Sequence, residues 1–169
     1  MKRFLRSVLW LLGIHVTALL VFTLFRLVEF IVLHGQITHP DISPAGAFIR
    51  GLWFDNVIAC YIMVAPLAVV LIAGIAGWSH HWFRRGVTLW LAVFYAIAFM
   101  PSAANTPYFA YFFKNINSSI FGWFGYTATT AGMLVEEKGY WLYIALYIAL
   151  TTAFIWALLR MERVYAKSL

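Results

Sequence analysis

Two opposite charges stand inside an otherwise apolar stretch near the start of the chain. Arg26 and Glu29 follow a run from Val8 to Phe25 that carries no charge. Residues three apart share one face of an α-helix, so these two side chains can pair. A charge inside a membrane costs at least about 2.5 kcal/mol, which makes a partner or a polar environment necessary. The pattern predicts either an intramembrane ion pair between Arg26 and Glu29 or a polar feature that faces a lipid headgroup or a cavity.

A second pair of charges opens the next apolar stretch, in the segment Phe48-Ile-Arg-Gly-Leu-Trp-Phe-Asp-Asn56. Arg50 and Asp55 are five residues apart, so on a helix they point about 140° away from each other and need not pair. Arg50 can hold a phosphate through a bidentate contact. Asp55 can cap the helix or reach Arg26 of the first stretch. The alternative is that both are ordinary anchors at the membrane interface.

Aromatic side chains alternate with amides and hydroxyls between Asn105 and Ser119, where Lys114 is the single cation. This composition is typical of an amphipathic helix that lies in the membrane interface. Its hydrogen-bond donors can contact lipid headgroups, which makes Asn105, Tyr108 and Lys114 candidate headgroup contacts. Simple anchoring is the alternative interpretation.

Known catalytic motifs do not occur in this sequence. It contains no Gly-x-Ser-x-Gly, no His-Glu-x-x-His and no Gly-rich phosphate loop. His34 and His39 lie near Asp41, but they lack the ligand spacing of a metal site. The sequence therefore predicts no catalytic residue, no metal site and no cofactor within this chain.

Four long apolar stretches must position these residues. Hydrophobic residues make up 64% of the 169 residues and charged residues only 11%, with a mean hydropathy of +0.85. A soluble domain carries about 25% charged residues, and about 20 apolar residues suffice to cross a bilayer. The sequence predicts an all-α, polytopic membrane helix bundle, a single transmembrane domain with spans at about 7–33, 52–78, 86–105 and 139–160.

The stretch 107–135 is predicted to be an interfacial helix and loop. Residues 115–135 carry no charge and are long enough to span, but glycine, serine, threonine and asparagine dominate them. Unsatisfied polar groups are costly in lipid, which argues against a fifth span there.

Basic residues favour four spans with both termini in the cytoplasm. In that topology the cytoplasmic segments hold most of them: Lys2, Arg3, Arg6, Arg84, Arg85, Arg160, Arg163 and Lys167. The outer segments hold only Arg50, Lys114 and Lys138. This bias follows the positive-inside rule. We expect a multi-pass protein of a bacterial cytoplasmic (inner) membrane whose partners are membrane lipids, including anionic phospholipid headgroups, and not nucleic acid.

Two of these segments resemble a known family. Arg50-Gly-Leu-Trp-Phe-Asp-Asn56 resembles the Gly-x-Arg/Trp-Phe-Asp signature of lipoteichoic acid synthase-like membrane enzymes, which belong to the alkaline-phosphatase ("sulfatase") superfamily. Asn105-Thr-Pro-Tyr-Phe109 resembles their Asn/Asp-x-x-Tyr-Phe/Tyr stretch. The order of the parts matches over nearly the whole chain.

The resemblance implies a membrane domain followed by a further span and an extracytoplasmic α/β catalytic domain. That domain uses a threonine or serine nucleophile and a divalent metal such as Mn or Mg to transfer phosphoglycerol, phosphoethanolamine or a related group from a lipid. The resemblance implies that this chain is the membrane-anchoring domain without the catalytic part. Arg50, Asp55, Asn105 and Tyr108 would be its structural or lipid-facing motif positions.

Two other functions stay open. A stand-alone membrane scaffold or assembly protein without catalysis would also carry no catalytic motif. A small transporter would need polar residues near the bilayer midplane, broken helices or paired repeats. Pro66 is the one candidate break at depth, and the polar residues gather toward the outer edge, so the sequence favours transport least.

Overall fold

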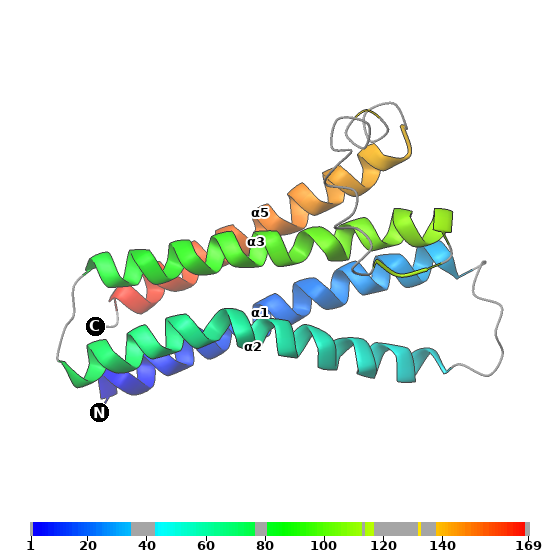
Figure 1. Ribbon diagram of the computed structural model, residues 1–169. Helices are drawn as coiled ribbons and strands as arrows, with labels where there is room; N and C mark the ends of the chain where they lie inside the picture. The colour runs from blue at the N-terminus through cyan, green and yellow to red at the C-terminus, as the bar shows by residue number, and fades with distance from the viewer. Residues whose placement is uncertain are drawn as a thin grey trace.

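The computed structural model describes residues 2–34, 43–76, 81–112, 114–116, 132 and 138–167. Within these ranges the chain forms four long α-helices and no strand (Figure 1): α1 (Lys2–Leu33), α2 (Pro44–Ile75), α3 (His81–Phe112) and α5 (Tyr140–Lys167). Each of these helices is long and apolar enough to cross a membrane. The predicted all-α bundle of four spans is therefore confirmed, and the chain is a multi-pass membrane protein.

Successive helices run in opposite directions. The N-terminus of α1, the end of α2, the start of α3 and the C-terminus of α5 lie together, at the left in Figure 1. We call this the near end of the bundle and the opposite one the far end. Helices α1 and α3 form the centre, because each packs against the other three, whereas the described parts of α2 and α5 do not pack against each other.

Aromatic rings fill the place where α1, α3 and α5 meet. Phe99 of α3 packs edge-on against Phe22 of α1 and Phe154 of α5, with ring centroids 4.9 and 5.2 Å apart. Tyr95, one turn earlier on α3, lies 5.1 Å from Phe154. Both Tyr95 and Phe99 are fully buried. Helices in lipid associate through such close packing, since lipid tails are as apolar as the side chains themselves.

Large apolar side chains also cover the outside of the bundle. On α2, Trp53, Tyr61 and Ile75 are 72%, 77% and 89% exposed. In water such a surface would aggregate, whereas in a bilayer it contacts the hydrocarbon directly. The outward faces therefore match a bundle surrounded by lipid.

Pro66 lies inside α2 and leaves the carbonyl of Ile62 without its helical donor. The indole Nε1 of Trp90, on α3, donates to that carbonyl oxygen at 3.1 Å. The neighbouring helix thereby restores a hydrogen bond that lipid cannot provide. The break predicted at Pro66 is thus bridged by a contact between α2 and α3.

Helix α3 continues through Pro101 and Pro107 to Phe112. The third span was expected to end near residue 105, so the first part of the predicted interfacial stretch 107–135 belongs to the same helix. A proline removes one backbone donor, and ending a helix early in lipid would leave more groups unsatisfied. Residues 117–131 and 133–137, on which the rest of that prediction falls, lie outside the described residues.

The near end is joined by polar and aromatic contacts to the last turns of α5. Arg84 Nε of α3 donates to Glu162 Oε1 at 2.8 Å. Tyr165 stacks on Trp10 of α1, with centroids 5.0 Å apart, and its hydroxyl hydrogen-bonds to Ser7. These contacts fix the C-terminal end of α5 against both central helices.

Candidate functional site

Polar side chains from three helices converge at the far end of the bundle. We call them the far-end polar cluster: Arg26 and Glu29 of α1, Asp55 of α2, Asn105 of α3 and Asn115, which follows α3. The antiparallel arrangement brings the last turns of α1 level with the first half of α2 and the last turns of α3. Residues far apart in sequence therefore meet in one place.

Arg26 and Asp55 form a two-point ion pair between α1 and α2. Arg26 Nη1 lies 2.7 Å from Asp55 Oδ2, and Nη2 donates to Oδ1 at 3.0 Å. The side chains are 24% and 8% exposed, so the pair faces the interior of the bundle. Of the two roles considered for Asp55, the contact with Arg26 is the one the structure shows. The ion-pair partner of Arg26 lies 29 residues away and is not Glu29, one turn along its own helix.

Gly51 makes this ion pair possible. A Cβ atom at Gly51 would overlap the guanidinium group of Arg26. Gly51 and Asp55 are four residues apart on α2, so they lie on the same face, and the guanidinium rests on the backbone beside the carboxylate. The sequence analysis missed this role, because nothing in the sequence of α2 alone indicates that a guanidinium approaches Gly51.

Asn105 connects Glu29 to the segment after α3. Its Nδ2 donates to Glu29 Oε1 at 2.6 Å and to Asn115 Oδ1 at 3.1 Å. Its Oδ1 accepts the backbone N–H of Ile116 at 2.9 Å. One amide side chain thus fixes the end of α1, the end of α3 and residues 114–116 relative to one another.

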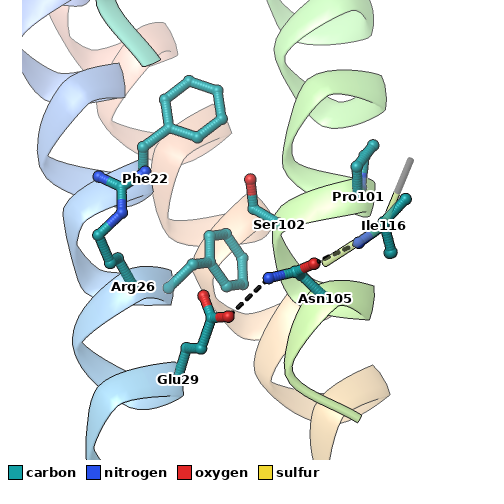
Figure 2. Close-up of a pocket in the computed structure, with 8 residues that line it drawn as sticks. Phe22, Arg26, Glu29, Pro101, Ser102, Asn105 and Ile116 are labelled. Carbon is teal, nitrogen blue, oxygen red and sulfur yellow. Dashed lines mark hydrogen bonds between the residues drawn. The ribbon is translucent and has the colours of Figure 1, made fainter. Parts of the chain in front are cut away.

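A pocket of about 200 Å³ opens between α1 and α3 beside these contacts. Arg26, Glu29, Ser102 and Asn105 supply its polar lining, and Phe22 and Phe25 supply aromatic side chains. In Figure 2 the Glu29 carboxylate reaches toward Asn105, whereas the Arg26 guanidinium extends along α1 toward Phe22. The lining combines one guanidinium, one carboxylate, one amide, one hydroxyl and two aromatic rings.

A further polar contact joins α1 and α2 beside the cluster. His15 Nε2 lies 2.9 Å from Asn56 Oδ1, within hydrogen-bond distance. The sequence analysis assigned no role to His15. Nothing in the sequence of α1 alone indicated that its partner would be the residue after Asp55.

The other predicted headgroup contacts, Arg50, Tyr108 and Lys114, lie toward the far end of the bundle. Arg50 and Lys114 are exposed. Tyr108 is half-buried and packs on Phe112 with ring centroids 4.7 Å apart. Asp55 is 5% exposed and faces the bundle rather than a headgroup. Arg50 and Lys114 are therefore accessible to lipid headgroups, whereas Asp55 is buried between the helices.

No group of three His, Cys, Asp or Glu side chains suited to a metal ion occurs in the part of the chain that the structure describes. His39 and Asp41 lie outside that part. Within the described cluster the charged side chains join helices to one another, Arg26 to Asp55 and Glu29 to Asn105. The arrangement is chemically suited to binding and positioning.

Comparisons with protein-family models, with curated proteins and with solved structures find no match for this chain.

Proposed function

We propose that this chain is the membrane-anchoring domain of a lipoteichoic acid synthase-like enzyme, one that transfers phosphoglycerol, phosphoethanolamine or a related group from a lipid. In this proposal the nucleophile and the divalent metal belong to an extracytoplasmic catalytic domain. The bundle anchors that domain and presents the far end to it and to lipid headgroups.

One observation carries the proposal: the two segments that resemble this family meet in a single structural unit. Asp55, from the first segment, binds Arg26 at 2.7 Å. Asn105, from the second, binds Glu29 at 2.6 Å. Arg26 and Glu29 are one turn apart on α1, so both segments hold the same stretch of that helix. Short motifs that converge in this way are better explained as parts of one domain than as unrelated matches.

The proposal places the near end in the cytoplasm and the far end outside a bacterial cytoplasmic membrane. The near end carries Arg84 and Arg85 at the start of α3 and Arg160 and Arg163 on the last turns of α5. A basic excess of this kind marks the cytoplasmic side. The exposed Arg50 would then lie at the outer headgroup level, where its guanidinium can bind lipid phosphate.

A stand-alone scaffold without catalysis is the second candidate. The observation that favours it is that the charges of the far-end polar cluster are engaged within the bundle. Arg26 pairs with Asp55, and Glu29 accepts from Asn105, as in a brace between helices. A scaffold needs such rigidity and nothing more.

Affinity purification of the tagged protein from its native host distinguishes the two candidates. The anchoring role is supported if the purified polypeptide is well above 19.3 kDa and contains peptides of a sulfatase-type domain. It is equally supported if a separate co-purifying subunit contains such peptides. The chain recovered at 19.3 kDa without such a domain, and without lipid-dependent transferase activity in the eluate, contradicts the anchoring role and favours the scaffold.

A further inference from the structure

The pocket between α1 and α3 has an uneven balance of charge. Arg26 and Glu29 both line it, and the Arg26 charge is matched by Asp55 of α2 through two contacts of 2.7 and 3.0 Å. Glu29 accepts a neutral amide N–H from Asn105, and no cation of the described residues pairs with it. The charges of Arg26, Asp55 and Glu29 together sum to one negative charge. The field in the pocket therefore attracts a cation and repels a phosphate.

The other lining groups select the kind of cation. The faces of aromatic rings such as Phe22 and Phe25 attract organic cations. The Ser102 hydroxyl offers a second oxygen acceptor on the α3 side. Calcium and magnesium ions require about six oxygen ligands, which one carboxylate and one hydroxyl do not approach. A primary ammonium group, with three N–H donors, matches a carboxylate, a hydroxyl and ring faces.

We propose that this pocket binds a primary ammonium group, supplied by an aminophospholipid headgroup or by a free amine. Its volume of about 200 Å³ accommodates an ethanolamine-sized group. The pocket lies beside the last turns of α1, near the far end of a span, where a lipid headgroup can reach it. The inference deepens the proposed function, on which it rests only for the side of the membrane that the pocket faces.

Lipid retention tests this assignment. The full chain is placed in nanodiscs with equal amounts of phosphatidylethanolamine and phosphatidylglycerol, and retained lipids are counted by native mass spectrometry. The key variant is Glu29→Gln, which keeps an oxygen for Asn105 but removes the charge. The matched control is Glu162→Gln, because Glu162 pairs with Arg84 at the near end. Ser102→Ala removes the second acceptor and leaves the Glu29–Asn105 contact in place.

The wild type and Glu162→Gln should retain phosphatidylethanolamine over phosphatidylglycerol. Glu29→Gln should lose about tenfold in this preference, as expected when a charge-assisted hydrogen bond becomes neutral, and Ser102→Ala should lose a smaller part. Release of the lipid by free ethanolamine would show that the ammonium alone is recognised, and retention despite it that the whole lipid headgroup is. The assignment is overturned if a folded Glu29→Gln or Ser102→Ala variant retains phosphatidylethanolamine over phosphatidylglycerol as strongly as the wild type does. It is also overturned if the wild type retains phosphatidylglycerol over phosphatidylethanolamine.

Failure of this inference is distinguishable from failure of the proposed function. A chain that co-purifies with a sulfatase-type domain but shows no ammonium preference contradicts the inference alone. A chain that occurs at 19.3 kDa by itself and still retains phosphatidylethanolamine through Glu29 supports the inference and contradicts the anchoring role.

Discussion

Removing one partner of the Arg26–Asp55 ion pair should have unequal effects, depending on which partner is removed. Arg26→Met keeps the length of the side chain and deletes its charge. Asp55, whose side chain is 8% exposed, then remains inside the bundle without a cation. Breaking a buried ion pair from one side costs about 3–5 kcal/mol, and an aspartate at the centre of a span costs about 2.5–3.5 kcal/mol on insertion scales. We expect a loss of about 3 kcal/mol.

Asp55→Asn should be milder. It leaves a polar side chain of nearly the same shape beside Gly51, and Arg26 keeps two ways to satisfy its charge. The Arg26 side chain is already 24% exposed and can extend toward the interface. Glu29 lies one turn along the same helix, within reach of the freed guanidinium. The loss should therefore be about 1–2 kcal/mol, the cost of weakened hydrogen bonds.

The double variant, Arg26→Met with Asp55→Asn, should be about 1–2 kcal/mol more stable than Arg26→Met alone, because no charge is then left unpaired between α1 and α2. The measurement is unfolding of the purified chain in mixed micelles with increasing SDS, followed by circular dichroism. Arg85→Met, which removes an exposed arginine at the near end, is the control and should stay within about 0.5 kcal/mol of wild type. Equal losses for the two single variants, or additive losses in the double variant, would refute this account of the pair.

Three further changes have defined outcomes. Gly51→Ala should displace the Arg26 guanidinium and lower the free energy of unfolding by about 1–3 kcal/mol in the same assay, and an unchanged value would contradict the close approach. Trp90→Phe should cost about 1 kcal/mol in the wild type but much less in a Pro66→Ala background, where the helix supplies its own donor; equal costs would contradict that role. Arg50→Ala should reduce the anionic lipid that co-purifies with the chain, and unchanged lipid would contradict a phosphate contact there.

The four helices of the described residues could be predicted because lipid leaves few alternatives. A backbone in hydrocarbon must satisfy its own hydrogen bonds, so each long apolar stretch becomes a helix. The same rule explains why α3 continues to Phe112, where the sequence analysis gave too much weight to Pro101 and Pro107. A proline ends a helix in water more readily than in a membrane, because ending the helix in lipid leaves further backbone N–H and C=O groups without hydrogen bonds.

The pairing of the charged residues could be predicted only in part. Spacing along α1 indicated that Arg26 and Glu29 share a face, but the rotation of α2 and α3 against that face depends on packing. Asp55 was one of two partners considered for Arg26, whereas the contact between Glu29 and Asn105 was not anticipated. Gly51 was overlooked because the need for a missing side chain becomes visible only when the guanidinium lies against the helix backbone.

Topology mapping tests the central claim most directly. Reporters that are active on only one side of the membrane are fused after Gly86, Lys138 and Leu169 in the full chain. Four spans with the far end outside predict that Gly86 and Leu169 report the cytoplasm and that Lys138 reports the exterior. If Leu169 reports the side opposite to Gly86, the four-span account is contradicted. If all three reporters are reversed, the bundle stands, but the far end faces the cytoplasm and the proposed anchoring of an extracytoplasmic domain is contradicted.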